Sequence, residues 1–271
     1  MATATVAPAP TTRSQWRSVA LPSEHGGWGL TAEPIVLGLL IEPSVAGLFV
    51  GLAGVLAFLA RTPLKLALVD LTRRRTLDRT RMARRLATAE LAAIAGLAVA
   101  ALLTATGGFW WWPALVAAPL VSVELWFDMR SRGRRLAPEL TGAIGISALA
   151  AMIVLAAGGS ATVAIGAWLV LSARAVASIP YVRMQVLHIH DRPRSGPPQF
   201  VWDLLAVALV IAAVVVDRLM VAGAVAVLAI IAIQEITGLS PPPKATVQGI
   251  RQTIMGLGVV LVTWLGLLVG G

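Results

Sequence analysis

The feature that most constrains this chain is a series of long apolar blocks separated by short polar stretches. About 20 apolar residues in a helix cross the hydrocarbon core of a bilayer, and about 17 form the short end of the spanning range. The blocks therefore predict an all-α, polytopic membrane helix bundle with about nine transmembrane helices. They lie at residues 27–41, 44–60, 86–105, 109–127, 139–158, 161–181, 200–216, 219–238 and 254–270.

The composition agrees with a membrane protein. Only 13% of the residues are charged and 58% are hydrophobic, whereas a soluble domain carries about 25% charge. The absence of cysteine excludes disulfides, thiolate metal ligands and cysteine nucleophiles. Residues 1–20 lack an apolar core and are rich in Ala, Thr and Pro, which predicts a disordered tail, and residues 21–271 then form a single transmembrane domain.

The basic residues predict how the chain is oriented. Of the 22 Lys and Arg residues, 20 fall in the tail and in every second junction between blocks. Because loops rich in Lys and Arg stay on the cytoplasmic side, we expect a cytoplasmic N-terminus and an outer C-terminus in a multi-pass protein of the inner (plasma) membrane. The net charge of +9 then fits membrane lipids as partners and argues against nucleic acid.

Polar side chains gather in the cytoplasmic half of the predicted spans. Charged groups in a bilayer are costly and are therefore candidates for function. Their one-sided distribution predicts a polar cavity that opens to the cytoplasm. The side chains concerned are Glu33, Glu90, Glu124, Glu139, Arg174, Tyr181, Asp203 and Glu235.

The stretch Glu24-His25-Gly26-Gly27-Trp28 stands at the entrance to the first block. One interpretation is an interfacial collar, because Trp anchors helices at the membrane surface. The other is a site edge, in which Glu24 and His25, together with Glu33, act as acid, base or orienting groups. We carry these three residues forward as candidate catalytic residues. For Glu33 and Arg174 a purely structural ion pair between two helices is the alternative.

Two longer polar stretches lie on the predicted cytoplasmic side. Residues 61–85 are long enough to include a short surface helix, and residues 182–199 are expected to be irregular because they contain Pro and Gly. His188, His190 and Asp191 lie in the second stretch. With three histidines and no cysteine in the chain, a dedicated zinc or copper site is not predicted, and no role is assigned to these three residues.

Three stretches resemble the YwiC-like family of bacterial integral membrane proteins. They are PSEHGGWGLTAEP at 22–34, RTPLKLALVD at 61–70, and Arg174 taken with Tyr181-Val182-Arg183. The resemblance implies a membrane topology and brings no assigned activity.

The nine-span plan is also similar to that of the UbiA prenyltransferase superfamily, whose members bind an isoprenyl diphosphate through Mg²⁺ held by two aspartate-rich motifs. This chain departs from that pattern, because the first stretch holds only Asp70 and Asp78 and the second only Asp191. Clustered carboxylates, which a Mg²⁺–diphosphate site needs, are missing. We therefore predict no metal ligand and no cofactor, and Mg²⁺ has no support from a motif.

The leading hypothesis is a UbiA-like protein that binds or acts on an isoprenoid or other lipid phosphate, because guanidinium groups match phosphate oxygens. The alternatives are a non-catalytic membrane scaffold or assembly factor, and a small-solute transporter. The sequence leaves open whether the chain is an enzyme and what its oligomeric state is. The candidate substrate-binding residues are Arg61, Lys65, Asp70, Arg174, Tyr181 and Arg183.

Overall fold

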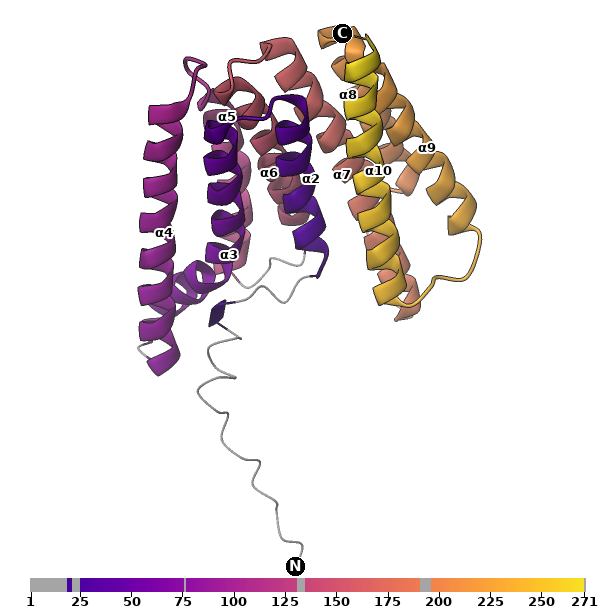
Figure 1. Cartoon of the computed structure of the whole chain (residues 1–271). Helices are drawn as coiled ribbons and strands as arrows, with labels where there is room; N and C mark the ends of the chain where they lie inside the picture. The colour runs from indigo at the N-terminus through magenta and orange to yellow at the C-terminus, as the bar shows by residue number, and fades with distance from the viewer. Residues whose placement is uncertain (1–18, 21–24, 76, 131–134, 191–195, 271) are drawn as a thin grey trace, which may run out of the picture.

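The computed structural model describes residues 19–20, 25–75, 77–130, 135–190 and 196–270. Within these residues the chain forms nine long α-helices that run alongside one another, and a short 3₁₀ turn, η1 (Arg218–Met220) (Figure 1). The helices are α2 (His25–Ile41), α3 (Val45–Thr72), α4 (Asp78–Thr104), α5 (Trp112–Met129), α6 (Leu136–Ala156), α7 (Ala161–Ile189), α8 (Gln199–Val216), α9 (Val221–Gly238) and α10 (Ala245–Gly270).

Each of the nine apolar blocks corresponds to one of these helices, so the prediction of an all-α, polytopic membrane bundle is confirmed. Seven of the described helices are long and apolar enough to cross a membrane. Helix α2 is apolar but shorter. Nine crossings, the UbiA-like packing and the orientation of the termini stay predictions.

One end of the bundle collects the basic connections. The α3–α4 turn and the α9–α10 connection lie at this end, and α2 begins there, whereas α10 ends at the opposite end (Figure 1). We call it the basic end. Of the predicted tail, residues 1–18 lie outside the described part, while Val19 and Ala20 are helical and buried.

The two polar stretches between helices are shorter than expected. Residues 61–72 continue α3 and residues 78–85 already belong to α4. The prediction of a separate surface helix between residues 61 and 85 is therefore wrong. Helix α7 likewise reaches Ile189, which makes the first part of 182–199 helical rather than irregular. The physical reason is that Arg and Lys are good helix formers, so a helix does not end where its apolar block ends.

Helices α6 and α7 form the centre of the bundle. Of their most apolar windows, 61% and 67% of the residues are buried, against 11% in α4. Their buried positions are mostly Ala, Gly and Ser. Small residues let helix backbones approach closely where no hydrophobic effect drives association in lipid. Helix α2 packs against α6, and α10 packs against α2.

Candidate functional site

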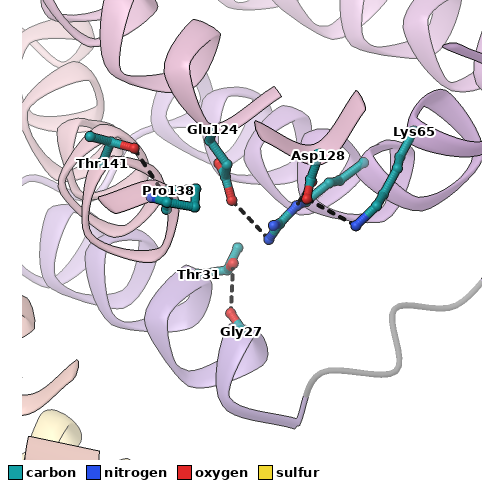
Figure 2. Close-up of polar contacts among 8 residues, drawn as sticks. Gly27, Thr31, Lys65, Glu124, Asp128, Pro138 and Thr141 are labelled. Atoms are coloured by element: carbon teal, nitrogen blue, oxygen red, sulfur yellow. Dashed lines mark hydrogen bonds and ion pairs between the residues drawn. The ribbon is translucent and has the colours of Figure 1, made fainter. Parts of the chain in front are cut away.

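The first charged group joins α3 to α5 at the basic end, and we call it the α3–α5 cluster. Arg61 donates from Nε to Asp128 Oδ2 at 3.0 Å and lies 2.8 Å from Glu124 through Nη1. Lys65 Nζ donates to Asp128 Oδ1 at 2.9 Å. Figure 2 shows the Glu124 and Asp128 side chains directed from α5 toward α3, where Lys65 lies. Among the described residues, two cations therefore meet two carboxylates.

Burial divides the cluster into a fixed and an accessible side. The Asp128 side chain is 0% exposed, whereas Arg61 and Lys65 are 27% and 36% exposed. A buried carboxylate needs such partners, since an unpaired charge away from water is costly. Gly142 of α6 makes room for the cluster, because a Cβ there would overlap the Glu124 carboxylate. The carboxylates thus hold the two cations in place while part of each cation stays accessible.

The Gly-Gly-Trp motif attaches α2 to α3 next to this cluster. The Trp28 ring meets Phe58 edge to face, with centroids 5.1 Å apart. A Cβ at Gly27 would lie 2.6 Å from Phe58 Cε2, so only glycine lets the ring sit there. Phe58 precedes Arg61 by about one helical turn, which places both on neighbouring positions of one face. The motif is therefore at least a packing device that sets the position of α3 beside the cluster.

This packing predicts opposite effects for two neighbouring substitutions. Gly27→Ala should lower the free energy of unfolding by about 1–3 kcal/mol, because the new methyl group displaces Phe58. Gly26→Ala has nothing within 4 Å of its Cβ and should be neutral or stabilise the helix by up to about 1 kcal/mol. Unfolding in mixed detergent micelles measures both. Equal effects of the two substitutions would contradict the packing role.

The second charged group lies on the other side of α2, and we call it the Glu33–Arg174 centre. Glu33 Oε1 lies 3.0 Å from Arg174 Nη2, and the two side chains are 3% and 4% exposed. Arg174 also donates from Nη2 to the backbone oxygen of Gln252 at 2.7 Å. A Cβ at Gly256 would overlap the Glu33 carboxylate and approach Arg174 Nη2. Helices α2, α7 and α10 therefore meet at one buried ion pair.

The pairing at this centre is incomplete. Glu33 Oε1 is close enough to Arg174 Nη2 for an ion pair, but the two groups are not aligned as a hydrogen bond. Among the described residues, Arg174 Nε and the Gln252 side-chain oxygen are also buried with no hydrogen-bond partner. Within the described residues, Arg174 reaches both Glu33 and the Gln252 carbonyl through the same nitrogen, Nη2, so the pair lacks the two parallel hydrogen bonds that strengthen arginine–carboxylate pairs. Glu33 and Arg174 thus form an ion pair between helices, and whether the pair is purely structural or also functional stays open.

The remaining candidate residues are not brought together. Asp70 is buried in the α3–α4 turn, where it accepts from Thr80 Oγ1 at 2.5 Å. Tyr181 is buried, with its hydroxyl 2.9 Å from Thr237 Oγ1. Arg183 lies 3.5 Å from Glu139 on the neighbouring helix. Each of the three thus has a local partner of its own.

The two candidates from the opening motif are described only in part. Glu24 lies outside the described residues, and His25 is the first residue of α2. The acid or base role expected for Glu24, His25 and Glu33 therefore stays a prediction. Glu33 lies in a buried charged contact with Arg174.

Sequence reasoning named Glu124 among the polar side chains of the cytoplasmic half but did not pair it with Arg61, and it did not single out Asp128. Glu124 and Asp128 are four residues apart near the end of an apolar block. That spacing places the two side chains on one helix face. It was the signal in the sequence that could have indicated a paired carboxylate site. Gly256 gave no signal, because nothing in the sequence places it against Glu33.

The expected cavity at the basic end stays a prediction. A cavity of about 200 Å³ lies at another place, between the end of α2, the start of α7 and the end of α10, and Glu42, Ser160 and Trp264 are among the residues that line it. Within the described ranges, no three His, Asp or Glu side chains come together as ligands for a metal ion.

Comparison with known proteins gives one match. Residues 21–154 match the family model described as YwiC-like protein. No curated protein matches the chain, and no solved structure does. The matched part includes α2 to α6 and therefore Glu33 and the whole α3–α5 cluster, whereas Arg174, Tyr181 and Arg183 lie beyond it. Over residues 21–154, just under half of its length, the chain is similar to the YwiC-like family.

Proposed function

We propose that this membrane protein binds the phosphate headgroup of an isoprenoid or other lipid at the α3–α5 cluster. The observation that carries the proposal is the placement of two partly exposed cations, Arg61 and Lys65, on a fully buried carboxylate at the basic end. The ammonium group of Lys65 has three donors, of which Asp128 accepts one. A phosphate oxygen fits the accessible side of that group.

The carboxylates of Glu124 and Asp128 affect how tightly the cluster is expected to bind a phosphate. Because two cations face two carboxylates, the cluster offers a phosphate no net attraction over a distance. Binding then depends on hydrogen bonds from cations that are already in place, which lowers the entropy cost of ordering them. The surrounding apolar helices supply the surface for a lipid tail. The proposal covers binding without Mg²⁺, and it assigns no turnover.

The test is thermal unfolding of the purified full chain in a neutral detergent, with isoprenyl monophosphates and diphosphates of several chain lengths. A ligand that binds the folded state raises the melting temperature by mass action. We expect a rise that grows with chain length and needs no Mg²⁺. Lys65→Met should weaken binding about tenfold, which corresponds to about 1.4 kcal/mol. The matched control is Lys244→Met, since Lys244 is exposed at the same end and is the only other lysine in the sequence.

Three outcomes would overturn the proposal. A melting temperature that no lipid phosphate changes would favour the scaffold or the transporter, and an uptake assay would then separate these two. Equal binding by the Lys65 and Lys244 variants would place the ligand elsewhere. A shift that requires Mg²⁺ would mean that carboxylates such as Asp70 and Asp78 hold a metal ion, contrary to the metal-free cluster.

A further inference from the structure

The turn between α3 and α4 has an arginine where a glycine is usual. The Arg75 N–H donates to the Asp70 carbonyl at 2.9 Å, and the Arg74 N–H donates to the Leu71 carbonyl at 3.1 Å. This pair of bonds is the Schellman ending of a helix, whose left-handed residue is usually Gly. Here that residue is Arg74, with φ of 51°.

A side chain in the left-handed region strains the backbone, because its Cβ crowds the following carbonyl. Residues held in this way persist where the surrounding structure enforces them, and they concentrate at functional positions. The turn is enforced, since the buried Asp70 carboxylate accepts from Thr80 of α4 at 2.5 Å and lies 3.8 Å from Arg79. An arginine at this position therefore suggests that its side chain has a use.

The neighbours of Arg74 show what that use is. Residues 73–75, which we call the arginine turn, are all exposed. Within the described residues, Arg74 and Arg75 have no ion-pair partner. Leu71 and Leu77 flank the turn and are 59% and 43% exposed. Cations thus stand between two exposed apolar side chains, the pattern of a segment that lies at a membrane surface.

The place of the turn in the fold agrees with contact with lipid. Helix α4 packs mainly against α3 and lies at the edge of the bundle (Figure 1). Helix α3 has 28 residues and helix α4 has 27. Both are longer than the roughly 20 residues that cross the hydrocarbon core. The hairpin therefore carries its turn beyond the hydrocarbon, to the depth of the headgroups.

We propose that the arginine turn binds the headgroups of anionic phospholipids, with Leu71 and Leu77 inserted beside their acyl chains. Charge complementarity identifies the occupant, because guanidinium groups hold phosphate oxygens through paired hydrogen bonds and anionic leaflets attract basic segments next to membrane helices. The two leucines favour a lipid over a water-soluble polyanion. This site is separate from the α3–α5 cluster, and the proposal does not rest on the proposed function.

The experiment uses the full chain, delipidated in a neutral detergent and titrated with phosphatidylglycerol or phosphatidylcholine, with bound lipid counted by native mass spectrometry. Arg74→Gly is the sharpest variant, since it restores the residue that the turn prefers. It should retain or raise the melting temperature while it weakens phosphatidylglycerol binding several-fold. Arg74→Gly with Arg75→Gln should weaken that binding about tenfold, and high salt should weaken it in the unaltered chain.

The matched control is Arg251→Gln, an exposed arginine near the start of α10, which should bind phosphatidylglycerol as the unaltered chain does. Phosphatidylcholine binding should be the same in every variant. The proposal would be overturned if the unaltered chain did not prefer phosphatidylglycerol, or if the double variant retained its affinity. An RNA oligonucleotide that bound the turn more tightly than the lipid would also overturn it.

Discussion

Replacing Arg174 with methionine should lower the free energy of unfolding by about 3–5 kcal/mol, the usual cost of removing one partner of a buried ion pair. The reason is that Glu33, which is 3% exposed, would then be buried without a counter-charge. Removal of the guanidinium also leaves the Gln252 carbonyl without the hydrogen bond that it accepts at 2.7 Å. Unfolding by a denaturing detergent in mixed micelles measures the loss.

A double variant separates the ion pair from a packing effect. Glu33→Leu combined with Arg174→Met removes both charges, and a buried pair replaced by apolar side chains is often neutral in stability. We therefore expect the double variant to recover much of the stability that the single variant loses. If the two single losses simply added, the two residues would not be coupled, and the centre would not stabilise the bundle as an ion pair.

The second large effect is expected at Gly256, on α10. Gly256→Ala should lower the free energy of unfolding by about 2–4 kcal/mol. The added methyl group would overlap the Glu33 carboxylate. It would therefore overpack the contact between the helices and disturb the ion pair of Glu33 with Arg174. The three helices that meet at this centre should loosen together. Unfolding in mixed micelles would show this as a single, earlier transition.

Gly258 provides the control on the same helix. Nothing lies within 4 Å of a Cβ built there. Gly258→Ala should therefore be neutral or stabilise α10 by up to about 1 kcal/mol, the difference in helix propensity between Gly and Ala. Equal losses at both glycines would mean that α10 is sensitive along its whole length, and the special role of Gly256 would be wrong.

These predictions bear on the question raised by the family signature. The α2 residues of this signature lie next to one charged group and belong to the other. Trp28 and Gly27 pack against Phe58, one helical turn before Arg61 of the α3–α5 cluster. One and a half turns further along, Glu33 reaches Arg174. Both interpretations of the opening motif thus keep a physical basis. The structure shows the motif as a packing contact between α2 and α3, and the interfacial collar and the site edge both stay predictions.

The helices were predictable from the sequence because their signal is local and strong. A run of 15 to 20 apolar residues can be buried in lipid only as a helix, since every backbone group must be paired within the segment. Residues 86–105 and 200–216 therefore marked α4 and α8. Where each helix ends was less predictable, because arginine-rich stretches such as 78–85 extend a helix without adding to the apolar signal.

The candidate site was predictable only in part. The cost of a charge in a bilayer singled out Glu33 and Arg174, and a pair between them was one of the two interpretations. The partners of Arg61 and Lys65 were missed, because Asp128 lies more than 60 positions away in the sequence and only helix packing brings it to α3. Asp70, a candidate substrate-binding residue, accepts a hydrogen bond from Thr80 in the α3–α4 turn, a contact that the sequence did not reveal, and its binding role stays a prediction.

The sequence by itself determined that this chain is a polytopic helical membrane protein, and it determined which of its ends is basic. Both properties follow from hydrophobicity and charge summed along the chain, and neither depends on which helices touch. Only the tertiary structure decided which charges meet. Ion pairs and the glycines that make room for them form across helices far apart in sequence, where close packing selects one neighbour among many. Arg174 meets Glu33 and Gly256 for that reason, and Lys65 meets Asp128.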